Sequence, residues 1–212
     1  MTQNQKDKTL FVSTLILVIL HLCGFIGMIT SWRNFFLMLT PFNLILSTAL
    51  LFFNHKQFNK SFFIFCVIGF FFGFFIEVAG VKTGAIFGEY SYGNTLGIKS
   101  FEVPWVIGLN WLMLVYSAGV ICHKLNINII LKSLLGATML VTLDFFIEPV
   151  AIKSDFWSWQ QINVPIQNYI AWFLASILLL FVFHKSQFDK NNKLAKALYI
   201  VQLMFFTLLN VF

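Results

Sequence analysis

The chain has 212 residues, of which 59% are hydrophobic and only 10% are charged, and 28 of them are phenylalanine. A water-soluble domain of this length needs a polar surface, and too few charges are present to make one. The net charge of +6 comes without a basic patch interleaved with aromatic residues, so we expect no nucleic acid partner.

Apolar runs of roughly 20 residues, the length of a helix that crosses about 30 Å of hydrocarbon, follow one another along the whole chain. The alternation of apolar and polar residues that is typical of membrane barrels is absent. We therefore predict an all-α polytopic membrane helical bundle of about seven transmembrane helices, with residues 1–212 forming a single integral membrane domain. The predicted spans are residues 9–29, 35–53, 61–81, 104–122, 129–150, 166–184 and 194–212.

Lysine and arginine predict the orientation, because positive residues are retained on the cytoplasmic side during insertion. Ten of them lie at the N-terminus and in the even-numbered loops, and four lie on the other side. We expect a multi-pass protein of the cell inner membrane with its N-terminus inside, its C-terminus outside and contact with anionic membrane lipid. The ten are Lys6, Lys8, Lys56, Lys60, Lys124, Lys132, Lys185, Lys190, Lys193 and Lys196, and the four are Arg33, Lys82, Lys99 and Lys153.

The third predicted span carries Glu77 near its outer end, after Gly69 and Gly73, whose spacing favours close approach of another helix. The loop that follows, residues 82–103, is expected to fold back over the outer end of this span. Tyr90 and Tyr92 would point to one side if that segment is extended. An ordinary interfacial loop with tyrosines at headgroup depth is an equally open interpretation.

The fourth and sixth spans each place an asparagine and a tryptophan about one turn in from the same membrane face. These are Asn110 with Trp111, and Asn168 with Trp172. They are candidates for binding substrate or water. Hydrogen bonding between helices explains the asparagines almost as well.

The fifth span contains Asp144 and Glu148, which are four residues apart and therefore share a face of the helix. Two acids in a poorly hydrated place cannot both ionise at low cost, so at least one of them is expected to hold its proton at neutral pH, as a general acid does. Pro149 is expected to end or kink the helix just beyond them. The alternative is a pair that binds surface water or a neighbouring helix.

Trp157 and Trp159 follow in the next loop, residues 151–165. They are either ordinary interfacial tryptophans or π-faces that stabilise positive charge during a reaction.

His21 is the one histidine that lies well within a predicted span, and we expect it to be a hydrogen-bonded core residue. Three cysteines lie in apolar runs without metal-ligand spacing, so neither a disulfide framework nor a metal site is expected.

Seven short motifs follow one another in a characteristic order between about residue 70 and residue 175. They are Glu77 with Gly80, TG at 83–84, FGEYSYG at 87–93, VPW at 103–105, Asp144 with Glu148-Pro149, WSW at 157–159 and VPIQNYIAW at 164–172. This order of motifs resembles the carotenoid hydratase family of the CruF type. Glu148 stands where the family often has aspartate, which keeps the carboxylate, and the connection after the WSW motif is shorter than usual.

This resemblance implies hydration of the terminal C1=C2 double bond of an acyclic carotenoid, lycopene or γ-carotene-like, taken from the bilayer, without a cofactor or metal. Contact with other membrane enzymes of the carotenoid pathway is a further expectation. The implied catalytic residues are Asp144, Glu148 and Glu77, and the implied substrate-binding residues are Tyr90, Tyr92, Asn110, Trp111, Trp157, Trp159, Asn168 and Trp172.

Two other classes of function remain open from the sequence. A membrane prenyltransferase acting on isoprenoid diphosphates also uses acids four residues apart, but it needs magnesium and basic residues for the diphosphate. A small proton-coupled transporter would also bury acids, although no internal repeat is present.

Overall fold

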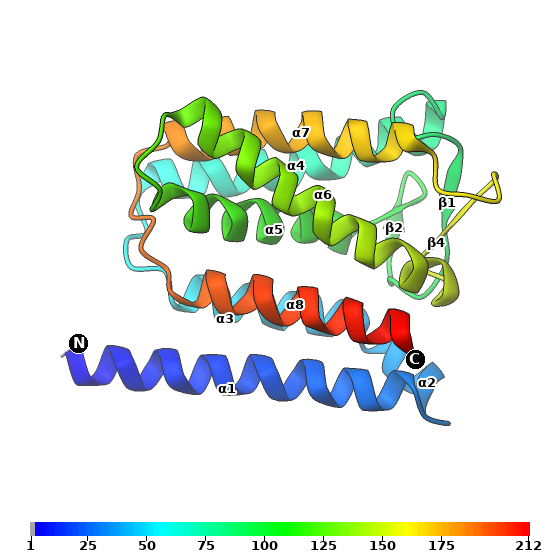
Figure 1. The fold of residues 1–212 in the computed structure, drawn as a ribbon, viewed down its shortest axis with the longest axis horizontal. Helices are drawn as coiled ribbons and strands as arrows, with labels where there is room; N and C mark the ends of the chain where they lie inside the picture. The colour runs from blue at the N-terminus through cyan, green and yellow to red at the C-terminus, as the bar shows by residue number, and fades with distance from the viewer. Residues whose placement is uncertain (1–2) are drawn as a thin grey trace.

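The computed structural model describes residues 3–212, except for the side chains of residues 3 and 6, so the side chain of Lys6 in the charge count lies outside the described atoms. Residues 3–212 form eight α-helices, with four short strands at one end of the bundle (Figure 1). The helices are α1 (Gln3–Met28), α2 (Arg33–Met38), α3 (Thr40–Phe53), α4 (Lys60–Thr83), α5 (Trp105–His123), α6 (Ile129–Lys153), α7 (Ile166–Lys185) and α8 (Leu194–Val211).

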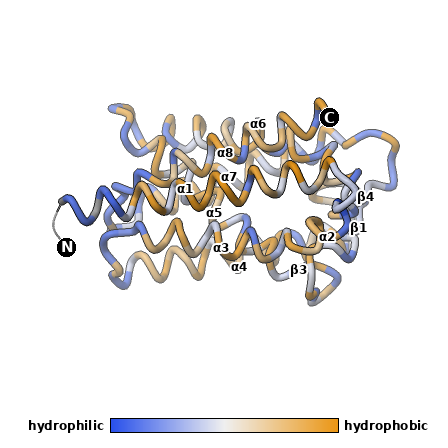
Figure 2. Tube along the Cα trace, turned by 90° about the horizontal axis from the view of Figure 1, so that it is seen from below, coloured by the Kyte–Doolittle hydropathy of each residue, from blue (hydrophilic) through white to orange (hydrophobic). Residues whose placement is uncertain are grey.

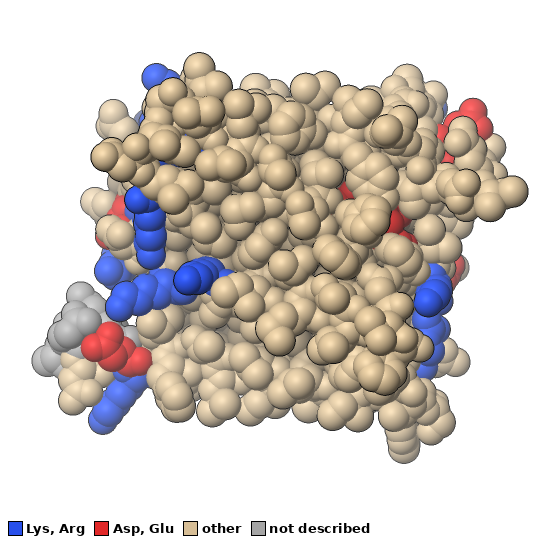
Figure 3. All heavy atoms as spheres, viewed as in Figure 1, with Lys and Arg blue, Asp and Glu red and all other residues tan. Residues whose placement is uncertain are grey.

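The prediction of an all-α membrane bundle is confirmed. Within residues 3–212, six helices are long and apolar enough to cross a membrane, namely α1, α4, α5, α6, α7 and α8. Hydrophobic residues fill the middle of the bundle and hydrophilic residues gather at its two ends (Figure 2). On the face in Figure 3, lysine and arginine lie only at those ends.

The second predicted span, residues 35–53, is divided in two. The six residues of α2 end at Met38, and α3 begins at Thr40 and has only 14 residues. Pro41 in the first turn of α3 has no backbone N–H to donate to the preceding turn, which accounts for the break. This part of the chain is therefore a helix break followed by a short apolar helix.

The bundle has three tiers, seen edge-on in Figure 1: α1 alone, then α3 with α8, then α4 to α7. The middle tier packs against the third through α5 and α6. The N-terminus and the C-terminus lie at opposite ends of the bundle, as the predicted orientation requires (Figure 1).

The two helices that carry the acids have well-defined starts. Asn59 caps α4 by accepting a hydrogen bond from the backbone N–H of Phe62, and Asn128 caps α6 in the same way through Leu131. At its other end α4 stops at Gly84, whose φ of 64° is favourable for glycine. These caps fix where along the bundle each acid lies.

The strands were not predicted. Strands β2 (Lys99–Ser100) and β3 (Val103–Pro104) form a tight hairpin. Strand β1 (Tyr90–Tyr92) pairs antiparallel with β4 (Trp157–Trp159), which joins the two long loops over the outer end of α4 and α6.

The orientation can be tested at Ser91, which is exposed on the outer face of β1. After the native cysteines Cys23, Cys66 and Cys122 are replaced by alanine, Ser91→Cys should react in intact cells with a membrane-impermeant maleimide. Lys56→Cys, exposed at the other end of the bundle, is the control and should react only after the cells are opened. The reverse pattern would overturn the predicted orientation.

Candidate active site

Glu77 lies in the last two turns of α4 and is only 3% exposed. Three side chains donate hydrogen bonds to it. The hydroxyls of Tyr90 and Tyr92 donate to Oε2 at 2.5 and 2.8 Å, and the indole of Trp111 donates to Oε1 at 2.9 Å. A buried carboxylate surrounded by donors in this way is held in one position and is stabilised as the anion.

Glu148, on α6, is 2% exposed and also receives three donors. The indoles of Trp157 and Trp159 donate to Oε2 at 3.0 and 2.9 Å. The amide of Asn168 donates to Oε1 at 3.0 Å. Five of the six tryptophans and tyrosines predicted as site residues thus donate a hydrogen bond to one of the two glutamates.

Asp144 lies one turn before Glu148 on the same face of α6, and it is 2% exposed. The same Asn168 amide nitrogen that contacts Glu148 donates to Asp144 Oδ2 at 3.0 Å, so it bridges the two acids. Asp144 also interacts electrostatically with Glu148 and Glu77. Among the described side chains, Asn168 is the one donor to Asp144, whereas each glutamate has three.

The β1–β4 pair explains how four aromatic side chains reach the acids. Its register sets Tyr90 opposite Trp159 and Tyr92 opposite Trp157. Because side chains alternate along a strand, all four point inward. The serines between them, Ser91 and Ser158, face outward. The interfacial reading of the two tyrosines is therefore wrong, since both are buried and bonded to Glu77.

Burial and the neighbouring Glu77 raise the pKa of both Tyr90 and Tyr92 well above the ordinary range of tyrosine. A raised pKa means that the phenol keeps its proton at neutral pH. Its hydrogen bond to Glu77 is therefore present below the ordinary tyrosine pKa of about 10 and is lost only as the pH rises through the higher, folded-state value.

The other three predicted binding residues, Trp172, Asn168 and Asn110, have different positions relative to the acids. Trp172 stacks on Trp111 with ring centroids 3.9 Å apart, so it supports the indole that contacts Glu77. Asn168 is 2% exposed, and its amide bridges Asp144 and Glu148. Asn110 is half-buried, and among the described residues its side chain makes no hydrogen bond to an acid. The structure therefore does not bring it together with Glu77, Asp144 and Glu148.

Sequence reasoning missed two residues that hold the strands in place. The ammonium group of Lys99 donates to the backbone oxygen of Tyr92 at 2.7 Å. The carboxylate of Asp155 accepts a hydrogen bond from the backbone N–H of Asn94 at 3.1 Å. Neither Lys99 nor Asp155 hydrogen-bonds to one of the three acids, and both act on the backbone of the loop that carries β1, so no local pattern in the sequence points to them.

The structure bears on two other expectations. Pro149 was expected to end or kink α6. The helix continues through it to Lys153, so the predicted end is wrong, and the kink stays a prediction. Gly69 and Gly73 do admit a neighbouring helix, as predicted. Gly69 faces Leu112 of α5, and Gly73 faces Trp111.

Gly73→Ala is expected to destabilise the protein by about 1–3 kcal/mol, the usual range for overpacking. A Cβ at Gly73 would lie 2.3 Å from the Cβ of Trp111, which would push the indole away from Glu77. The matched control is Gly24→Ala, where the new Cβ would lie 3.5 Å from Phe205. Thermal unfolding in detergent should show a lower midpoint for the first variant only, and equal midpoints would contradict this packing argument.

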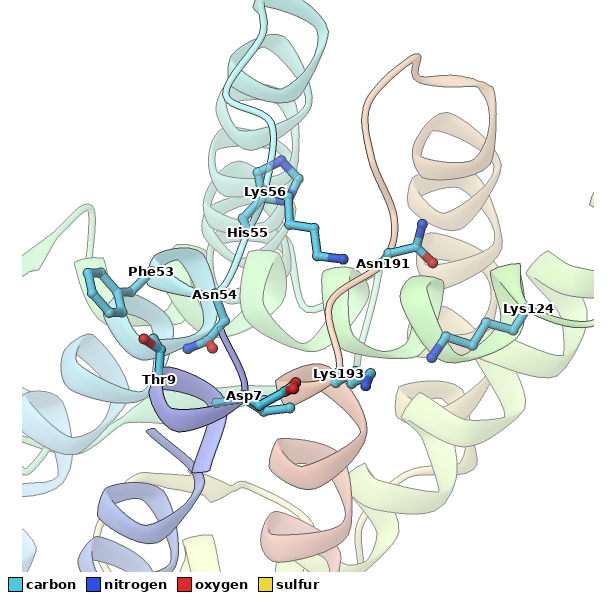
Figure 4. Close-up of a pocket in the computed structure, with 10 residues that line it drawn as sticks. Asp7, Thr9, Phe53, Asn54, His55, Lys56, Lys124, Asn191 and Lys193 are labelled. Carbon is cyan, nitrogen blue, oxygen red and sulfur yellow. The ribbon is translucent and has the colours of Figure 1, made fainter. Parts of the chain in front are cut away.

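A basic pocket of about 370 Å³ lies at the opposite end of the bundle (Figure 4). Lys56, Lys124 and Lys193 line it together with Asp7 and His55. A prenyltransferase would need its cations beside its acids to hold a diphosphate. Here the lysines of this pocket and the three buried acids are separated by the length of the bundle, so the geometry does not favour that alternative.

The model of a protein family described as carotenoid biosynthesis protein matches residues 35–212 of the chain. The chain belongs to this family. The matched region contains Glu77, Asp144 and Glu148 with all their hydrogen-bond donors, and it leaves out α1. The predicted resemblance to carotenoid hydratases is thus confirmed at the level of the family.

A named relative narrows the comparison. This carotenoid biosynthesis protein is 31% identical to bisanhydrobacterioruberin hydratase from Haloarcula japonica over 118 residues, which cover 51% of the chain and 40% of that relative. The chain thus matches less than half of the relative's length. No solved structure gives a significant match.

Proposed function

We propose that this protein is a hydro-lyase that adds water to the terminal C1=C2 double bond of an acyclic carotenoid. The observation that carries the proposal is the cluster of Glu77, Asp144 and Glu148, three buried acids surrounded by aromatic side chains, with Asn168 bridging Asp144 and Glu148. Membership of a carotenoid biosynthesis family and the relative named as a hydratase support it.

The reaction needs a proton donor at the alkene, and Asp144 suits that role best. Glu77 and Glu148 each accept three hydrogen bonds, as ionised carboxylates do, whereas Asp144 accepts one. Two neighbouring anions make a third charge costly in a buried place. Asp144 would therefore hold its proton. It would transfer this proton to C2 of the alkene, which leaves a tertiary cation at C1.

Water then attacks C1, and one of the glutamates accepts the proton that the water loses. The net change is addition of one water molecule, and return of that proton to Asp144 restores the starting state. The rings of Trp157, Trp159 and Tyr90 lie beside the acids, and a cation that meets their π-faces would be stabilised. The same closed surroundings would keep other water away from it.

The substrate would arrive sideways from the bilayer. Two shallow apolar grooves flank α7, one against α6 and one against α4. Their walls include Tyr169 and Gln167, the neighbours of Asn168 in the chain. A polyene lying along α7 would bring its end group next to the acid cluster. We place the enzyme in the cell inner membrane, in contact with lipid and with other membrane enzymes of the pathway.

The test is expression in a bacterium that makes lycopene or γ-carotene and has no hydratase of its own. Mass spectrometry of the extracted pigment should find a carotenoid heavier by one water. Unchanged pigment, with the protein accumulated in the membrane, would sink the proposed activity. Transport without chemical change, measured as flux into liposomes, would instead favour the transporter alternative.

A further inference from the structure

A second cavity, of about 300 Å³, lies inside the bundle between α1, α3 and α8. Most of its wall is apolar, with Leu20, Met28, Phe36 and Phe205 among the lining residues. Its volume is at the lower end of the range for ligand sites, so it suits one end of a long molecule better than the whole of it. None of the three acids lines it.

One wall of this cavity carries an amide oxygen with no partner. Gln202 on α8 is only 5% exposed, and its Oε1 atom hydrogen-bonds to no described residue. Burying such a group unpaired costs free energy, so an unpartnered amide oxygen in a cavity wall indicates a ligand or water that completes it.

His21 on α1 adds a second polar group to the same cavity. Its Nδ1 lies 2.9 Å from the backbone oxygen of Leu17, and because a carbonyl oxygen only accepts, Nδ1 carries the hydrogen. The other ring nitrogen, Nε2, is then an acceptor, and it has no partner among the described residues. The cavity thus offers a donor and acceptors in apolar surroundings, which a hydroxyl group on a hydrocarbon chain matches.

We propose that this cavity binds the hydroxyl-bearing end of an acyclic isoprenoid alcohol. The occupant follows from the proposed function, on which this inference rests, because hydration of the terminal double bond yields such an alcohol. Phe156 supports the link, since it lines the cavity and directly precedes Trp157 of β4 in the acid cluster. The cavity is then a holding site for the hydrated chain end, separate from the site where it is made.

The test compares two probes on the purified protein in detergent. One is geranyllinalool, an acyclic isoprenoid with a tertiary hydroxyl group, and the other is its hydrocarbon analogue without that group. The wild type should bind the alcohol about tenfold more tightly, the expected effect of one buried hydrogen bond. Gln202→Leu and the less disruptive Gln202→Met should reduce that ratio to about one, whereas Gln187→Leu, an exposed glutamine outside the cavity, should leave it unchanged.

Equal binding of the two probes by the wild type would overturn the inference, as would a preference for the alcohol that survives in both Gln202 variants. Either result would mean that water, and not the alcohol, hydrogen-bonds to the Gln202 amide. The binding measurement does not depend on turnover. A wild type that hydrates lycopene but shows no preference would sink the cavity proposal alone, and a Gln202-dependent preference without hydration would sink the proposed function alone.

Discussion

Asp144→Asn should reduce carotenoid hydration by at least a hundredfold in the lycopene-producing host, while the protein still accumulates in the membrane. General acid catalysis typically contributes about 10²- to 10⁴-fold. The substitution keeps the shape of the side chain and leaves an oxygen to accept the Asn168 hydrogen bond, but it removes the proton that the alkene needs. Product per unit of membrane protein is the quantity to measure.

Glu148→Gln is the comparison for this variant. Its amide nitrogen would face either the indoles of Trp157 and Trp159 or the amide of Asn168, so a donor would meet a donor. We expect a loss of folded protein but a smaller loss of hydration per folded molecule than in Asp144→Asn. Full hydration by Asp144→Asn would refute the assignment of the proton donor, and full activity of both variants would refute acid catalysis by this cluster.

Replacement of both Tyr90 and Tyr92 by phenylalanine should slow hydration about 100-fold. Both hydroxyls donate to the same oxygen of Glu77, and the substitutions remove both donors while they keep the rings. Each lost hydrogen bond to a charged group costs about 1.5–3 kcal/mol, and about 1.4 kcal/mol is a factor of ten. The rate of product formation in isolated membranes measures the effect.

Ser91→Ala is the matched control for the double variant, because Ser91 lies between the two tyrosines and faces outward toward Ser158. It should leave the rate unchanged. A double variant as active as the wild type would show that Glu77 does not need these donors, and its part in the reaction would have to be abandoned. Equal loss in the serine control would point instead to damage to the β1–β4 pair.

The sequence by itself determined the class of the fold and most of the residues of the cluster. Long apolar runs with few charges leave a helical membrane bundle as the stable solution, because backbone polar groups in hydrocarbon must be paired within the segment. Asp144 and Glu148 stood out because a carboxylate in such a run is costly, and their spacing placed them on one helix face.

Local sequence patterns did not predict the effect of each proline on its helix or the position of each asparagine relative to the acids. Pro41 breaks the second predicted span, whereas Pro149 is accommodated within α6. Both are prolines in apolar runs, but Pro41 lies in the first turn of a helix and Pro149 lies inside one. Asn110 and Asn168 look alike in sequence, yet only Asn168 lies on the helix face that meets the acids.

Tertiary structure alone decided that Glu77 and Glu148 are met by four aromatic donors from two loops. Strands β1 and β4 are separated by more than sixty residues, and three-residue strands have no periodicity long enough to predict their pairing. The register of that pair, and not the identity of its residues, determines which side chains face the acids. A shift of one residue would turn the serines inward and leave both glutamates without those partners, because neighbouring side chains on a strand point to opposite faces.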